Sequence, residues 1–186
     1  IFTMTGGTIT RNTASECGGG VYVLDGTFTM TGGTITENSA KFGGGVNVCG
    51  KNSTFTMGKG AVISKNSADS GAGVYVYAGG TAEMKDGEIS CNTADNCGGG
   101  VAVFADSKFV MHNGSVSYNV AGECGGGIHI NNSISGGAGG LAEIFAGVIE
   151  GNAANIHQFY GGGGIYVSGT KDKNNVNGTL KLHNAA

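Results

Sequence analysis

Short stretches in which apolar and polar residues alternate recur along the whole chain. A typical unit has Phe-x-Met, then an Ile between polar residues, then Val-x-Val, as in residues 28–30, 34–36 and 46–48. Apolar residues at every second position are typical of β-strands with one buried face, whereas helices need a period near 3.6. Gly, Asn, Asp and Ser separate the stretches and predict turns. We therefore expect three short strands in each unit and no helix.

The unit is repeated six times, and a partial seventh copy follows at residues 178–184. The nine-residue peptide FTMTGGTIT occurs twice, at residues 2–10 and 28–36. Every unit also contains the motif [Ile/Val]-x-x-Asn, and the successive asparagines lie 26, 28, 26, 27 and 33 residues apart. These asparagines are Asn12, Asn38, Asn66, Asn92, Asn119 and Asn152.

A repeat of this length cannot bury its apolar face alone, but it can do so by stacking on a copy of itself. We therefore expect an all-β fold, a parallel β-helix (solenoid) with about 26 residues and three strands per coil and six to seven coils. Equivalent residues would stack in columns, and the six asparagines would form a structural ladder because side-chain amides both donate and accept hydrogen bonds. A hairpin-based β-sandwich is the alternative fold, but it does not require matching side chains at equal spacing.

Composition narrows the range of functions. The chain of 186 residues has 39 glycines without a strict three-residue period, which excludes collagen. Its net charge is −3 and its only arginine is Arg11, so no basic stripe favours nucleic-acid binding. No apolar run approaches the ~20 residues that a membrane-spanning helix needs, so we expect no direct membrane insertion by this segment. We interpret residues 1–186 as a single domain and a fragment of a longer repeat protein.

The search for catalytic motifs favours a protein that is not an enzyme. The metalloprotease motif HExxH, the nucleophile motif GxSxG and the phosphate-binding P-loop do not occur. Asp69 and Asp95 would lie on adjacent coils, where two carboxylates could act in glycoside hydrolysis or hold a cation, but Lys41 offers them a simple ion-pair partner. Thr-x-Thr at residues 8–10 and 34–36 resembles the surface of ice-binding proteins but decays in later coils. We expect no catalytic residue, no cofactor and no metal.

Five cysteines occur, and three of them precede a glycine run at the same position of the repeat. Of these, Cys97 and Cys124 fall on neighbouring coils, at a separation that allows a disulfide. Free, partly buried thiols are the alternative. The odd number of cysteines leaves at least one thiol free or paired outside the chain.

The largest departures from the repeat lie near the C-terminal end, and such departures are where binding sites occur in solenoids. Longer links occupy residues 131–140 and 153–164. Exposed aromatic and polar side chains in this region would suit contact with a glycan or a protein. The alternative is that these links fold down over neighbouring coils. The candidate ligand-binding residues are His129, His157, Phe159, Tyr160 and Tyr166.

The alternation of two motifs resembles the repeats of chlamydial polymorphic outer membrane proteins. The matching segments are GGGV or GGGI at 18–21, 43–46, 98–101, 125–128 and 162–165, and GAGV at 71–74, each alternating with [Ile/Val]-x-x-Asn. Gly stands where that family has Ala, and Ile or Val stands where it has Phe. The resemblance covers residues 2–167 and implies a right-handed parallel β-helix, export, and an adhesive or stalk role without catalytic residues.

We therefore expect a non-catalytic segment of a secreted or cell-surface, adhesin-like bacterial protein. Its expected partner is a host or microbial surface glycan or protein, and its anchor to the outer membrane or cell wall would lie outside this chain. A carbohydrate-active β-helix enzyme and a pure structural spacer are the alternatives.

Overall fold

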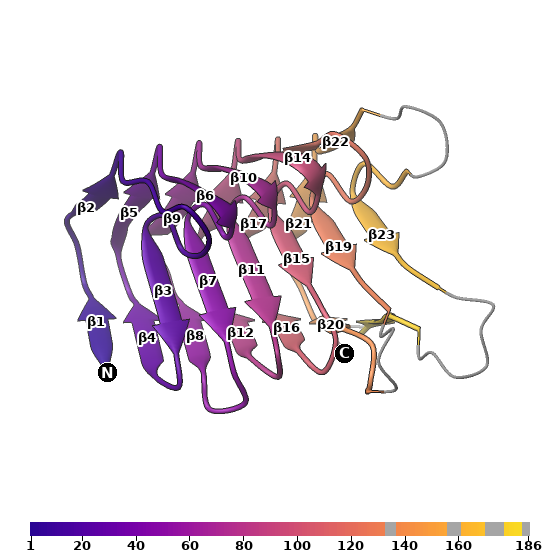
Figure 1. Cartoon of the computed structure of the whole chain (residues 1–186), viewed down its shortest axis with the longest axis horizontal. Helices are drawn as coiled ribbons and strands as arrows, with labels where there is room; N and C mark the ends of the chain where they lie inside the picture. The colour runs from indigo at the N-terminus through magenta and orange to yellow at the C-terminus, as the bar shows by residue number, and fades with distance from the viewer. Residues whose placement is uncertain (133–136, 156–160, 170–176, 184–186) are drawn as a thin grey trace.

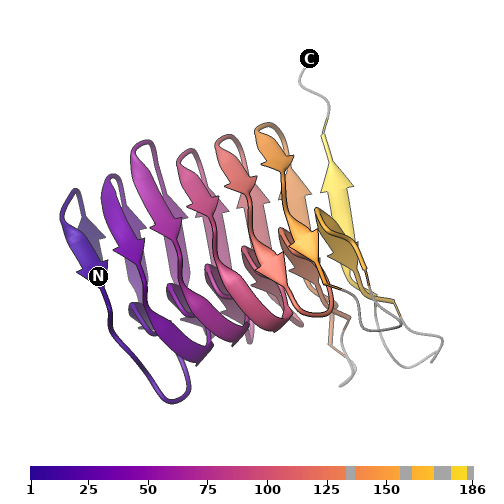
Figure 2. The ribbon, with the colours of Figure 1, turned by 90° about the horizontal axis from the view of Figure 1, so that it is seen from above.

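The computed structural model describes residues 1–132, 137–155, 161–169 and 177–183. All regular secondary structure in these residues is β, and strands of successive coils pair in parallel. The strands stack side by side along the long axis, from the N-terminus at one end to the C-terminal strands at the other (Figure 1), and the view from above shows the same succession of coils (Figure 2). The predicted all-β parallel solenoid is thus confirmed. In the described residues, no helix reaches the length and hydropathy needed to cross a bilayer.

Four sheets run through the stack, and we name each after its most characteristic buried residue. The Phe sheet consists of β1 (Phe2–Met4), β4 (Thr27–Met30), β8 (Thr54–Met57), β12 (Thr81–Met84), β16 (Lys108–Met111), β20 (Leu141–Ile144) and β24 (Thr179–Leu182). The Ile sheet consists of β2 (Thr8–Thr10), β5 (Gly33–Thr36), β9 (Ala61–Ser64), β13 (Glu88–Ser90), β17 (Ser115–Ser117) and β21 (Val148–Glu150). The Ala sheet consists of β6 (Ser39–Phe42), β10 (Ser67–Ser70), β14 (Thr93–Cys97), β18 (Val120–Ala121) and β22 (Ala153–Ala154). The Val sheet consists of β3 (Val21–Leu24), β7 (Val46–Cys49), β11 (Val74–Tyr77), β15 (Val101–Val103), β19 (Ile128–Ile130) and β23 (Ile165–Val167).

The expectation of three strands per coil is wrong for about five turns of the stack, in which all four sheets are present. The additional strand is the Ala-sheet segment that follows each ladder asparagine. Its inward residues are small alanines, and two of them, Ala68 and Ala94, form a separate small buried cluster with Ala72 of the turn that follows β10. A segment with one small apolar residue among Ser, Asp and Asn looks like a turn in the sequence. It becomes a strand because its backbone groups bond to the equivalent segment of the next coil.

Identical side chains stack in the interior. Phe2 pairs with Phe28 and Phe28 with Phe55, and their ring centroids lie 4.9 and 5.0 Å apart. Phe28 and Phe55 are buried, while Phe2, in the first coil, is 46% exposed. The spacing of the rings is that of neighbouring strands, so the repeat of one residue type fills each layer with the same shape.

The six repeat asparagines form a continuous hydrogen-bonded column at the turn between the Ile and Ala sheets. In each pair, the side-chain Nδ2 of one asparagine donates to Oδ1 of the next at 2.9–3.1 Å. The same Oδ1 accepts the backbone N–H of the preceding asparagine. Asn92, for example, is fully buried and also donates to the carbonyl oxygen of Ile63.

The residue before each ladder asparagine has a left-handed backbone conformation. Arg11, Glu37, Lys65, Cys91 and Tyr118 have φ between 54° and 58°, and Gly151 has φ of 61° in the sixth repeat. Positive φ is unfavourable for residues with a Cβ atom. The ladder therefore holds a strained turn in coil after coil.

Candidate functional site

In the Val sheet, the side chains that face outward form a column along the solenoid axis, and the residue type in this column changes from coil to coil. Its strands alternate, with two valines or isoleucines facing the apolar core and the residue between them facing outward. The strand register stacks these outward residues in the order Tyr22, Asn47, Tyr75, Ala102, His129 and Tyr166. His129 was predicted to be exposed, but this is wrong, since it is 5% exposed, and Asn47 (1%) and Tyr75 (7%) in the same column are buried as well.

Neighbouring aromatic rings cover Tyr75 and His129. Phe42 and Phe104 lie on either side of Tyr75, with ring centroids 5.1 and 4.9 Å away. Phe104 also meets His129 edge-on at 5.8 Å, and His129 lies 5.6 Å from Tyr166. Burial of the Tyr75 hydroxyl raises its pKa above the ordinary value.

These rings form one aromatic row along the axis of the solenoid. We use this name for Phe42, Tyr75, Tyr77, Phe104, His129 and Tyr166. Tyr77 is 47% exposed, so the row presents ring surface to solvent as well as burying it.

The sequence-based candidates did not include four members of the row, Phe42, Tyr75, Tyr77 and Phe104. Tyr77 and Phe104 each follow the last inward valine of a Val-sheet strand, and Phe42 lies just before a glycine run. Tyr75 occupies the outward position of its strand, whereas the other three residues reach this face from positions at either side of the outward column. Aromatic residues next to the outward positions were the available signal.

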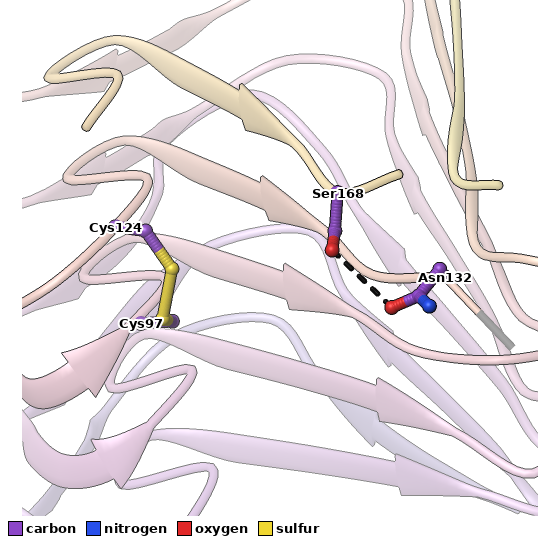
Figure 3. Close-up of a disulfide and its surroundings, with 4 residues drawn as sticks. All are labelled: Cys97, Cys124, Asn132 and Ser168. Atoms are coloured by element: carbon purple, nitrogen blue, oxygen red, sulfur yellow. Dashed lines mark hydrogen bonds between the residues drawn. A yellow bond between two sulfur atoms is a disulfide. The ribbon is translucent and has the colours of Figure 1, made fainter. Parts of the chain in front are cut away.

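A cavity of about 280 Å³ opens at the C-terminal end of the row. Its lining comes from three neighbouring coils and includes Cys97, Glu123, Cys124, His129, Asn131, Asn132, Tyr166 and Ser168. The Ser168 hydroxyl donates to Asn132 Oδ1 at 3.2 Å, and this bond lies at the opposite end of the strands from the two cysteines (Figure 3). The cavity therefore has amide, hydroxyl and carboxylate groups next to aromatic rings, a mixture typical of ligand sites.

His129 is a buried polar side chain whose hydrogen bonding is incomplete. Among the described residues, no group is within hydrogen-bond reach of its Nδ1 atom. Loss of solvent around the ring lowers the pKa of His129 to about 4, so the imidazole is neutral at physiological pH. The turn that leads to His129 is tight, since Gly125 has φ of 60° and a Cβ atom there would lie 2.8 Å from the Cα atom of His129. This turn brings Cys124 next to the imidazole.

Cys97 and Cys124 are joined by a disulfide (Figure 3). Their Cα atoms are 4.7 Å apart, and the two residues pair across neighbouring coils. The thiols of Cys17, Cys49 and Cys91 are free. Burial raises the pKa of the Cys17 thiol, which disfavours its thiolate.

The structure brings together two of the five candidate ligand-binding residues, His129 and Tyr166. Both line the cavity. The other three candidates, His157, Phe159 and Tyr160, lie outside the described residues.

The two carboxylates considered for catalysis lie on the outer side of the Ala sheet. The register of β10 and β14 shifts between Ala68 and Ser70, so that Asp95 is not placed directly opposite Asp69 as a simple ladder would require. Lys41 pairs with Glu16, at 3.7 Å between Nζ and Oε2, in place of the expected partnership with the aspartates.

The threonine array is short. Thr8–Thr10 of β2 pairs in register with the Thr34–Thr36 part of β5, and the next strand carries Val62 and Ser64 at these positions. Threonine pairs thus cover two coils of the Ile sheet.

Comparison with known proteins gives no further assignment. Searches found no protein-family model, no curated protein and no solved structure that matches this chain.

Proposed function

We propose that this chain is a non-catalytic binding segment of a secreted or cell-surface, adhesin-like protein, and that the aromatic row of the Val sheet contacts a glycan. The observation that carries the proposal is the row itself. Six ring side chains follow one another along the solenoid axis on a single face, with centroid distances of 4.9–6.5 Å between neighbours.

The chemistry of the row suits an extended sugar polymer. Aromatic rings offer flat apolar surface that the C–H faces of sugar rings can cover, and a tyrosine adds a polar group at its edge. Tyr77 supplies exposed ring surface in the middle of the row. At the C-terminal end, Asn131 and Asn132 place amide groups at the cavity, where sugar hydroxyls can hydrogen-bond.

Rigidity supports the same role. Over about five turns, successive coils are bonded through four sheets, and the asparagine ladder joins them as well, so the row is held on a regular scaffold. A preformed face loses little conformational entropy on binding. We propose that the coil is right-handed, as parallel crossover connections nearly always are, and that it comprises six to seven coils of one domain.

Export is part of the proposal. Disulfides persist in oxidising compartments and are rare in the cytosol, so the Cys97–Cys124 bond supports an extracellular or surface location. The resemblance of the repeats to surface-protein repeats points in the same direction. An anchor to the cell surface would then be supplied by regions outside this chain.

A glycan-binding screen followed by affinity measurement tests the proposal. We expect the wild-type protein to bind at least one surface glycan, and the double substitution Tyr77→Ala with Phe104→Ala to weaken that binding about 10-fold or more. Tyr118→Ala is the matched control, because Tyr118 is 60% exposed but lies at the turn before the ladder. Circular dichroism checks that all variants remain folded.

Three results would contradict the proposal. Absence of glycan binding would favour a pure spacer, and equal binding by the double variant and the control would place any binding surface elsewhere. Release of sugar products from a bound polysaccharide would show a carbohydrate-active enzyme instead.

A further inference from the structure

Three side chains with metal-binding atoms converge at the cavity beside Tyr166. Both sulfur atoms, of Cys97 and Cys124, and a ring nitrogen of His129 all lie within 4.8 Å of one another. The two cysteines are held on neighbouring coils, and His129 is held in β19 by the tight turn that begins at Gly125. The backbone therefore keeps these three groups together whether or not the sulfur atoms are bonded.

We propose that reduction of the Cys97–Cys124 disulfide converts this cluster into a Cys₂His site for Zn²⁺. A dithiol reductant supplies two electrons and two protons, becomes a disulfide itself, and leaves two thiols where the S–S bond was. Binding of Zn²⁺ then forms two Zn–S bonds and one Zn–N bond and releases the two thiol protons. The same residues thus serve as a covalent link between coils when oxidised and as metal ligands when reduced.

The incomplete hydrogen bonding of His129 is the second observation behind the proposal. Its Nδ1 atom is buried, and the described residues offer it no partner. Buried polar atoms in native proteins nearly always have a partner, so an orphan is explained when it serves a group that binds there. A buried, neutral imidazole is the form of histidine that coordinates zinc.

The geometry also fits zinc. Zn–S bonds of about 2.3 Å and Zn–N bonds of about 2.0 Å in a tetrahedron place ligand atoms roughly 3.5–3.8 Å apart, which is within the spread of this cluster. The Cα atoms of the cysteines, 4.7 Å apart, allow the thiols to rotate away from each other without moving the strands. Glu123 also lines the cavity, and its carboxylate or a water molecule can take the fourth position.

The sequence motifs did not indicate this site because its ligands come from two coils. Cys124 and His129 are five residues apart, and Cys97 lies 27 residues before Cys124. This spacing corresponds to no common zinc motif, and only the stacking of the coils brings the three residues together.

Co²⁺ titration of one protein in two oxidation states tests the proposal. The protein carries Cys17→Ser, Cys49→Ser and Cys91→Ser, so that Cys97 and Cys124 are its only remaining cysteines. After reduction with a phosphine, which takes an oxygen atom from water and leaves the same two thiols, we expect one Co²⁺ per chain. Its spectrum should show thiolate-to-cobalt charge transfer and the ligand-field bands of tetrahedral Co²⁺, and Zn²⁺ should displace it.

The oxidised sample of the same protein is the matched control and should show no such bands. His129→Phe keeps a ring against Phe104 and Tyr166 but removes the nitrogen ligand. Loss of an outer-shell partner of a ligand already costs about 10- to 100-fold in metal affinity, so we expect this variant to bind Co²⁺ at least about 100-fold more weakly.

If the reduced protein remains folded, either of two results would overturn the proposal: no binding of Co²⁺, or unchanged affinity in His129→Phe. If reduction unfolds the protein, circular dichroism should recover when Zn²⁺ is added to the parent but not to His129→Phe, and failure to recover in the parent would also overturn it.

Discussion

Two columns of outward or corner residues run the length of this solenoid, and both contain buried polar side chains. In the asparagine ladder, the amide of Asn92 makes hydrogen bonds with Asn66, Asn119 and Ile63. In the outer column of the Val sheet, Asn47 Oδ1 and His129 Nδ1 are buried, and the described residues provide no partner for either atom. Asn92, Asn47 and His129 are all buried, but the two columns differ in how completely these polar side chains are hydrogen-bonded.

The difference follows from repetition. A ladder asparagine finds its partner in the next coil because the next coil carries the same residue at the same height. Asn47 has Tyr22 and Tyr75 as its neighbours along the axis, so the stack supplies no matching amide. Repeated polar residues therefore build the scaffold, whereas polar residues that occur once in a column are the places to look for binding.

The largest expected effect comes from breaking the ladder at its centre. Asn92→Ala removes the oxygen that accepts hydrogen bonds from the backbone N–H and the side-chain Nδ2 of Asn66. It also removes the Nδ2 donor to Asn119 Oδ1 and to the carbonyl oxygen of Ile63. Buried groups left without partners cost about 1–3 kcal/mol each, so we expect the free energy of unfolding to fall by about 4 kcal/mol. Urea unfolding followed by circular dichroism measures this loss.

Asn47→Ala is the matched control, because Asn47 is as buried as Asn92 but donates one hydrogen bond, from Nδ2 to the carbonyl oxygen of Phe42 at 3.2 Å. Its substitution also removes an oxygen without a partner, so we expect a change of no more than about 1 kcal/mol. If the two substitutions lowered the free energy of unfolding by similar amounts, the ladder would not stabilise the fold more than other buried polar residues do.

The next effect is a pH dependence of the free energy of unfolding. It distinguishes the two columns because the asparagine amides do not titrate, whereas the His129 imidazole does. The pKa of His129 is about 4 in the folded, oxidised protein, against 6.5 for an ordinary histidine. As the pH falls below 6.5 the unfolded chain takes up a proton that the folded chain cannot, so stability is lost until about pH 4. A difference of about 2.5 pH units corresponds to roughly 3 kcal/mol.

Urea midpoints between about pH 7 and pH 4 test this expectation in the presence of a chelator. His129→Phe should remove the dependence in that window. Glu37 and Glu143 contribute at lower pH, because ion pairs with Arg11, and with Lys108 and Lys181, lower the pKa of these carboxyls below 4.5. An unchanged pH profile in His129→Phe would contradict the assignment.

The repeats predicted much of this architecture from the sequence. The recurrence of Phe2, Phe28 and Phe55, and of the six asparagines at intervals of 26–33 residues, was sufficient to predict the parallel solenoid, because stacking of the coils places such equivalent residues in contact. The Ala sheet was not predicted because its strands each have one small inward residue and so show no clear alternation of apolar and polar side chains. These strands are identified only by the backbone hydrogen bonds between coils.

The site was predicted in part. His129 and Tyr166 were identified because they fall where the repeat is interrupted, but His129 was expected to be exposed. Its burial depends on Phe104, which belongs to another coil and lies outside the alternating pattern. Contacts between coils that involve non-repeated residues cannot be read from periodicity, and these contacts make up the aromatic row.

The smallest expected effect concerns the strain that accompanies the ladder. Lys65, just before Asn66, has φ of 55°, whereas the sixth repeat has Gly151 at this position with φ of 61°. The left-handed conformation costs a residue with a Cβ atom about 1–2 kcal/mol, and glycine loses about 0.5–1 kcal/mol more backbone entropy on folding. We therefore expect Lys65→Gly to raise the free energy of unfolding by about 0.5 kcal/mol.

Lys59→Gly is the matched control, because Lys59 is exposed and does not have positive φ, so the same substitution should lower stability there. If urea unfolding showed both variants to be destabilised, the backbone at Lys65 would be unstrained, and the ladder would form without holding an unfavourable turn.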